Sequence, residues 1–177
     1  MIGVLVSGEG SNLQALLDAG LPVSAVASNR AGIRALERAL AAGVPAAAFE
    51  LDGFADRAQR DATMANWLQE QGVRLVVCAG YMQLLTTPFL QRFPGRIVNV
   101  HPSLLPEFPG ARAIHDALAA GVATTGVTVH LVDEGLDTGP VIRQEPVPVE
   151  PQETLTERIH AVEHRLLPEV VRDLCVR

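Results

Sequence analysis

The sequence contains no lysine, and all 14 of its basic residues are arginine. Schiff-base chemistry, which needs a lysine amine, and a phosphate loop of the Walker type, which needs a conserved lysine, are therefore excluded. An anionic ligand must be held by arginine or by backbone N–H groups. The 20 acidic residues give a formal net charge of −6, which argues against nucleic acid as the main ligand.

Long apolar runs are also missing, although hydrophobic residues make up 48% of the 177. No run reaches the roughly 20 residues that span a membrane, and no leader precedes the first apolar stretch, so we expect a soluble chain without a signal peptide. The sequence has two cysteines, Cys78 in an apolar run and Cys175 near the C-terminus, and neither fits a metal-binding or redox motif. We expect the reducing cytoplasm as the compartment.

Short apolar runs alternate with helical patterns along the chain. This alternation predicts an α/β fold with one open, mostly parallel twisted sheet, helices on both faces, and one or two later strands antiparallel. No repeat or linker is present, so we predict a single domain over residues 1–177. We expect Pro168 to interrupt or kink the last helix. The expected strands cover residues 2–6, 23–28, 46–49, 74–80, 96–100, 126–132 and 141–149. One helix is expected to begin near residue 12, and the other expected helices cover 34–42, 55–71, 88–93, 112–120 and 152–174.

The segment SGEGSN, residues 7–12, follows the first expected strand. Its glycines let the backbone approach a ligand, and the next helix offers N–H groups and the positive end of its dipole. We predict phosphate binding here. The dinucleotide fingerprint G-x-G-x-x-G is not met, because Leu13 stands where the last glycine should be. The alternative is an ordinary turn in which Ser11 or Asn12 caps the helix.

Asn99 and His101 lie two residues apart at the end of an apolar strand that Pro102 terminates. Strand side chains alternate between faces, so these two should point the same way. Ligands of open α/β sheets bind beyond the carboxyl ends of the strands. An amide beside an imidazole supplies two hydrogen-bond donors, one of them able to exchange a proton, which suits an oxyanion. The alternative is that both side chains satisfy backbone groups at the strand end.

Asp137 lies in the turn-rich segment DEGLDTGPVI, residues 133–142, between two expected strands. Its carboxylate could return to His101 and favour the charged imidazole. Alone this indication is weak, because aspartate-rich turns are usually only turns. The remaining histidines, of which His130 alternates with Thr128 on one strand face, show no convincing metal spacing with a carboxylate or cysteine, so no metal is expected.

Together these residues resemble the folate-dependent formyltransferases, whose fold is Rossmann-like. NVHPSLLP, residues 99–106, is similar to the superfamily signature Asn-x-His-Pro-Ser-Leu-Leu-Pro, and GLDTGPVI follows at the family's spacing. SGEGSNLQAL, AGYMQLL and VEHRLLP resemble the branch that acts on glycinamide ribonucleotide. The resemblance implies transfer of a formyl group from 10-formyltetrahydrofolate, a co-substrate, to the amine of 5′-phosphoribosylglycinamide in purine biosynthesis. It implies small-molecule partners, no nucleic acid and no membrane, in a monomer or homodimer.

The resemblance also implies roles for individual residues. Asn99 and protonated His101 would stabilise the formyl oxyanion, Asp137 would keep His101 charged, and no nucleophilic serine or cysteine would be needed. The backbone of Gly10, Ser11 and Asn12 would hold the substrate phosphate, and Glu163 the ribose hydroxyls. Arg57 would meet the acidic tail of the folate. The residues implied around the pteridine are Met82, Gln83, Leu84, Leu85, Asn99, Asp133, Glu134, Gly135 and Leu136.

Two positions depart from the family pattern: Gln83 stands where relatives often carry arginine, and Ile114 where many carry histidine. Three alternatives remain. A methionyl-tRNA formyltransferase should have a basic C-terminal domain. A formyltetrahydrofolate deformylase should have a regulatory domain before the first strand and would use the same trio with water as acceptor. From a different class, a non-catalytic nucleotide-binding module would fit the dinucleotide fingerprint better.

Overall fold

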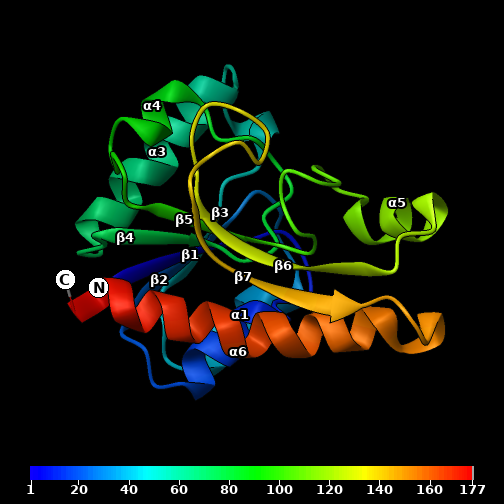
Figure 1. Ribbon diagram of the computed structural model, residues 1–177. Coiled ribbons are helices and arrows are strands. Elements are labelled where there is room, and N and C mark those ends of the chain that lie inside the picture. Colours follow the sequence, from blue (N-terminus) through cyan, green and yellow to red (C-terminus); the bar gives the residue numbers. More distant parts are fainter. Residues whose placement is uncertain (177) are drawn as a thin grey trace. The chain divides into compact units, whose positions relative to one another are not determined.

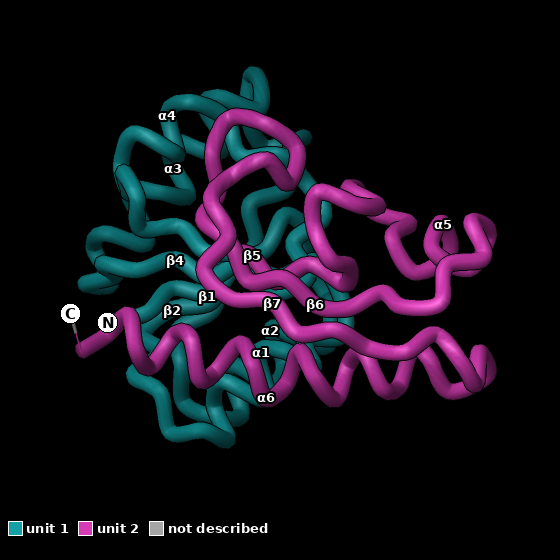
Figure 2. The backbone as a smooth tube through the Cα atoms, in the orientation of Figure 1, with its two compact units in different colours: residues 1–98 teal, residues 99–177 magenta. Residues whose placement is uncertain are grey.

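The computed structural model of the chain describes residues 1–176, and its contacts divide it into two compact units (Figure 2). The first unit runs from Met1 to Val98, and the second begins at Asn99. The boundary falls within strand β5 (Ile97–His101). The single catalytic domain over residues 1–177 stays a prediction.

The first unit contains four parallel strands in the order β3-β2-β1-β4. Figure 1 shows α3 and α4 on one side of these strands and α1 and α2 on the other. Strands β1 and β4 are buried along their whole length, because helices cover both faces. The elements are β1 (Ile2–Val6), α1 (Ser11–Asp18), β2 (Val23–Ser28), α2 (Arg34–Ala41), β3 (Ala46–Ala48), a 3-10 turn (Leu51–Gly53), α3 (Arg57–Glu70), β4 (Leu75–Cys78) and α4 (Thr87–Leu90).

The second unit contains strand β6 (Thr124–Leu131) paired antiparallel with β7 (Val141–Pro148). Two prolines of β7, Pro146 and Pro148, lie opposite Gly126 and Thr124 of β6. The other elements are α5 (Ala113–Ala120), a 3-10 turn (Gln152–Thr154) and α6 (Leu155–Val176), which packs on β6 and β7. The predicted α/β fold, mostly parallel with a late antiparallel strand, is confirmed.

Helix α6 continues through Pro168, so the predicted interruption of this helix is wrong, while the alternative of a kink at Pro168 stays a prediction. A proline in a helix loses one backbone hydrogen bond and crowds the preceding turn. Here the Pro168 ring is buried in the apolar face of the helix together with Leu166, Leu167, Val170 and Val171. Burial of this face stabilises the helix enough to offset the lost hydrogen bond.

None of the helices described within residues 1–176 combines the length and the apolar character needed to cross a membrane.

Candidate active site

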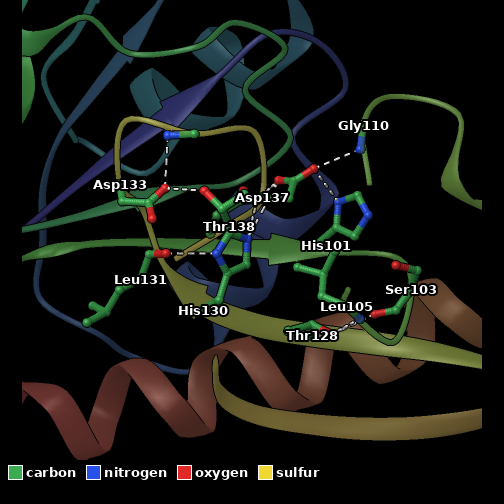
Figure 3. Close-up of polar contacts among 12 residues, drawn as sticks. His101, Ser103, Leu105, Gly110, Thr128, His130, Leu131, Asp133, Asp137 and Thr138 are labelled. Carbon is green, nitrogen blue, oxygen red and sulfur yellow. Dashed lines mark hydrogen bonds and ion pairs between the residues drawn. The ribbon is translucent and has the colours of Figure 1, made fainter. Parts of the chain in front are cut away.

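Asn99 and His101 lie on β5, and the Asp137 side chain from the loop between β6 and β7 contacts both. Figure 3 shows the Asp137 carboxylate pointing toward His101. The His101 Nδ1 lies 3.5 Å from Asp137 Oδ2, and the Asn99 amide nitrogen lies 3.5 Å from Asp137 Oδ1. The His101 and Asp137 side chains are 5% and 12% exposed. The structure thus brings together the three residues of the implied catalytic trio in the second unit.

The second ring nitrogen of His101 fixes its orientation. Nε2 lies 2.8 Å from the carbonyl oxygen of Phe108, which can only accept, so Nε2 carries a proton and Nδ1 faces Asp137. Phe108 has a φ of 51°, an uncommon conformation for a bulky residue. Backbone strain of this kind gathers at functional sites. The carbonyl that holds His101 is therefore presented by a strained turn.

Asp137 also has a left-handed backbone, with a φ of 54°, which aspartate tolerates better than most residues. Its Oδ2 accepts a 2.8 Å hydrogen bond from the Gly110 N–H. Because that donor belongs to the loop after β5, Asp137 ties the β6–β7 loop to the segment that follows His101. One carboxylate thus contacts both the imidazole and the loop beside it.

His130 is a fourth member of this cluster, and it was not among the site residues predicted from the sequence. Its Nδ1 lies 2.8 Å from the Leu131 carbonyl and must carry the proton, so Nε2 accepts from the Asn99 amide at 3.2 Å. Nε2 also lies 3.7 Å from Asp137 Oδ1. Burial lowers the pKa of His130, which keeps the ring neutral and suited to accepting this hydrogen bond. The alternation of His130 with Thr128 indicated that the two share one face of the strand, but not that His130 lies beside Asn99.

A second network holds the loop that follows His101. The Thr128 hydroxyl donates to the Ser103 carbonyl at 2.6 Å and accepts from the Leu105 N–H at 3.1 Å (Figure 3). Gln144 of β7 donates to Leu105 O and to the Thr128 hydroxyl at 2.8 and 2.9 Å. Ser103 Oγ donates to the Glu107 carbonyl at 2.5 Å. Ser103 is therefore engaged in shaping the loop and is not placed as a nucleophile.

The predicted phosphate loop begins helix α1 in the first unit. Gly10 is the N-cap, with a φ of 74°, so the alternative of Ser11 or Asn12 as the cap is wrong. A side chain at Gly10 would stand 2.8 Å from the Ala35 backbone, which explains why this position has none. Arg38 Nε donates to the Glu9 carbonyl at 2.9 Å and anchors the loop to α2. The N-terminus of a helix is a ready anion site.

The loops after β1 and β4 lie side by side in the first unit. The Ser7 hydroxyl donates to Asn29 Oδ1 at 2.6 Å and accepts from the Met82 N–H at 2.9 Å. Strand order reverses between β1 and β4, and open α/β sheets bind ligands at such a point. Residues 82–85 follow directly after this point, and within them Met82 is 67% exposed and Leu84 is 48% exposed. An exposed apolar pair at a binding edge is suited to a flat apolar ligand.

Arg57 begins helix α3 and contacts this segment: its Nη2 donates to the Leu84 carbonyl, and its side chain is exposed. The Gln83 side-chain oxygen accepts a hydrogen bond from Arg60. Arg57 is therefore held close to residues 82–85 and still faces solvent, where it can meet an anionic group.

The other residues implied by the resemblance lie in the second unit. Asp133 Oδ1 accepts from the Gly135 N–H at 3.0 Å and from the Thr138 hydroxyl at 2.7 Å, which closes a turn that leaves Leu136 50% exposed. Glu163 is buried on α6, with 6% exposure. Within residues 1–176, no three His, Cys, Asp or Glu side chains gather in a way that could hold a metal ion.

Comparison with known proteins gives one consistent result. The family model described as formyl transferase matches residues 1–171. The solved structure of glycinamide ribonucleotide transformylase 1 from Symbiobacterium toebii is 48% identical, with a TM-score of 0.94 over 97% of this chain and 85% of that chain. Phosphoribosylglycinamide formyltransferase from Bacillus subtilis is 38% identical over 97% of this chain and 92% of its own length. A trifunctional purine biosynthetic protein adenosine-3 from Drosophila pseudoobscura pseudoobscura is 44% identical over 96% of this chain, which spans 13% of that protein.

Proposed function

Since the chain belongs to the formyl transferase family, we propose that it transfers the formyl group of 10-formyltetrahydrofolate to the amine of 5′-phosphoribosylglycinamide. The products are N-formylglycinamide ribonucleotide and tetrahydrofolate, in de novo purine biosynthesis. The observation that carries the proposal is the gathering of Asn99, His101 and Asp137, with contacts of 3.5 Å from the carboxylate to the amide and to the imidazole. The names of the relatives support the choice of acceptor.

In the proposed reaction the substrate amine attacks the formyl carbon, and negative charge develops on the formyl oxygen. Asn99 and protonated His101 stabilise that oxyanion, because positioned donors act most strongly where charge develops. Their 3.5 Å contacts with Asp137 are long, as catalytic hydrogen bonds often are before substrate binds. A substrate oxygen can replace them with shorter bonds. Neutral His130 keeps the Asn99 amide turned toward the site.

The formyl C–N bond to the folate then breaks, and a proton from the attacking amine reaches the folate nitrogen. Two carriers fit the site: His101 itself, or a water bound by Asp137. No covalent enzyme intermediate is required. Burial raises the pKa of the Cys78 thiol to about 12, so this cysteine stays protonated and is not a competing nucleophile.

The proposal also assigns the two ligands. The helix N-terminus at Gly10, Ser11 and Asn12 would bind the ribonucleotide phosphate, with Glu163 on its ribose. Arg57 would bind the acidic tail of the donor, and the exposed apolar side chains of residues 82–85 and the turn at 133–136 would contact its bicyclic ring. No lysine competes for either anion.

We propose the cytoplasm as the compartment. Cys78 and Cys175 are both free thiols, and a reducing environment favours free thiols. A monomer or homodimer is the proposed assembly.

One assay tests the function against its alternatives. The chain is mixed with 10-formyltetrahydrofolate, and release of tetrahydrofolate is followed with and without 5′-phosphoribosylglycinamide. Release that requires the amine supports the proposal. Release without it would identify a deformylase, and no release under either condition would leave a binding module. A His101→Ala variant serves as the control, because it should abolish release that comes from this site.

A further inference from the structure

A buried ion pair lies on α3, next to the segment of residues 82–86. Arg60 and Asp61 are both 0% exposed, and Arg60 has the largest volume among the fully buried residues that the structure describes. Consecutive helix residues do not normally face each other. Here, however, Arg60 Nε and Nη2 both donate to Asp61 Oδ1, at 2.9 and 2.6 Å. The side chain of Arg60 is thus folded back on its neighbour and kept out of solvent.

The remaining polar atoms of the pair reach the 82–86 segment at two points. Arg60 Nη1 donates to the side-chain oxygen of Gln83. Asp61 Oδ2 accepts from the N–H and the hydroxyl of Thr86, at 2.9 and 2.8 Å. Thr86 is the N-cap of α4, so Asp61 fixes the point where the segment enters that helix. The segment is therefore gripped on both sides of Leu84 and Leu85.

The shape that this grip imposes is an unusual one. Met82 and Leu84 are exposed, while Tyr81 and Leu85 beside them are 9% and 8% exposed. Each exposed apolar side chain forgoes the stabilisation that its burial would give. Buried ion pairs contribute little net stability compared with apolar residues of the same size. The use of this pair therefore lies in the geometry that it holds.

We propose that Arg60 and Asp61 are a positioning pair that sets the affinity for the formyl donor, by holding residues 82–86 in the shape that contacts its bicyclic ring. The inference rests on the proposed function, since this segment meets the donor only if the chain uses 10-formyltetrahydrofolate. Neither residue touches the donor, because both side chains are buried. Their effect passes through Gln83 and Thr86.

The test uses the double variant Arg60→Met with Asp61→Asn. Methionine keeps the apolar volume, asparagine keeps an oxygen for Thr86, and no lone charge is left buried. Because a charge-assisted hydrogen bond and the segment's shape are lost together, tetrahydrofolate binding, measured by fluorescence titration, should weaken by about tenfold. The KM for the donor should rise by a similar factor, while kcat and the KM for the ribonucleotide change less than about threefold.

Two further variants sharpen the result. Gln83→Leu removes the Arg60 contact without altering α3, should weaken donor binding in the same direction, and keeps the test open if the double variant does not fold. Arg143→Met removes an arginine ion pair with Asp173 and Glu169 elsewhere on the chain and should leave donor affinity unchanged. Hydrogen exchange of the amides of residues 82–86 should accelerate in the double variant and in Gln83→Leu, and should not change in Arg143→Met.

Equal donor affinity in the wild type, the double variant and Gln83→Leu overturns the inference. A lower kcat and a lower melting temperature, together with a rise in both KM values, also overturn the inference. That pattern marks a purely structural pair. A wild-type chain that transfers no formyl group refutes the proposed function instead. In that case hydrogen exchange still tests whether Arg60 and Asp61 hold residues 82–86. Unchanged exchange of these amides in the double variant would show that they do not, and would overturn the inference as well.

Discussion

Replacing Asp137 by asparagine tests the electrostatic core of the site with little change in shape. The asparagine side chain has the same size and can still accept the hydrogen bond from the Gly110 N–H, which is 2.8 Å long in the wild type. What disappears is the negative charge 3.5 Å from His101 Nδ1. The substitution therefore separates the charge of Asp137 from its part in holding the loop.

The expected magnitude follows from that distance. Two unit charges about 3.5 Å apart interact by about 5 kcal/mol at an effective dielectric constant near 20, and by about 1 kcal/mol in bulk water. The side chains are 5% and 12% exposed, so the pair lies between these limits and nearer the first. At about 1.4 kcal/mol per decade of rate, we expect kcat to fall by at least about 10²-fold. Both KM values should change far less, because the charge acts on the transition state.

Steady-state kinetics of four variants decide the matter. Asp137→Asn and His101→Ala are compared with the double variant, and Asp173→Asn, which removes a carboxylate 2.9 Å from Arg143, is the control for charge removal. Members of one catalytic unit are non-additive, so the double variant should be little worse than His101→Ala. Losses that multiply, or an Asp137→Asn enzyme with nearly wild-type kcat, would refute the coupling.

Three further expectations follow from the site. Gly10→Ala should raise the KM for the ribonucleotide and lower the free energy of unfolding, measured by urea denaturation. The loss should exceed the roughly 1–2 kcal/mol that a left-handed backbone costs, because the new Cβ would meet Ala35 of α2. Gly43→Ala is the control: Gly43 has a φ of 73° and open space around it, so this variant should show the backbone cost alone. Arg57→Ala should raise the donor KM about tenfold and leave the ribonucleotide KM unchanged; the reverse pattern would assign Arg57 to the phosphate. Burial lowers the pKa of His130 and of His164. Below about pH 6.5 the unfolded chain therefore binds more protons than the folded chain. The free energy of unfolding should be highest above that pH and should fall on acidification until the folded-state pKa values are passed. His130→Gln should flatten this dependence in denaturant titrations, and an unchanged slope would contradict the assignment.

Much of the first unit could be predicted from local pattern. Strands β1 and β2 have the bounds that their apolar runs predict, since parallel strands covered on both faces are continuously apolar. Helix α3 begins one residue after Asp56, whose carboxylate accepts from the Gln59 N–H at 2.8 Å. The shared face of Asn99 and His101 follows from strand alternation alone. Asp137, by contrast, was only weakly indicated by its own segment and was assigned to the site through the family resemblance, because a turn does not reveal where it folds back.

The parts that were missed depend on contacts between distant segments. Which side chain of β6 lies beside Asn99 depends on strand register, so His130 could not be singled out from periodicity. Arginine is usually solvated, and the burial of Arg60 depends on its contacts with Asp61 and with Gln83, 23 residues away. Proline normally ends a helix, but burial of the Pro168 ring among apolar neighbours of α6 outweighs that preference, and this packing is not visible in the local sequence.

The two prolines of β7 restrict how this chain can associate with copies of itself. Pro146 and Pro148 are two residues apart, so the missing N–H groups fall on the same side of the strand. Prolines in a sheet are tolerated where that side faces away from the paired neighbour. The free edge of β7 therefore lacks two donors in succession, and a second chain cannot extend a continuous ladder there. Arg143 and Glu145, which pair with side chains of α6, add charge along the same strand. A homodimer could not form by extending the sheet in a continuous ladder at this edge, and partly folded chains are guarded against edge-to-edge aggregation at this strand.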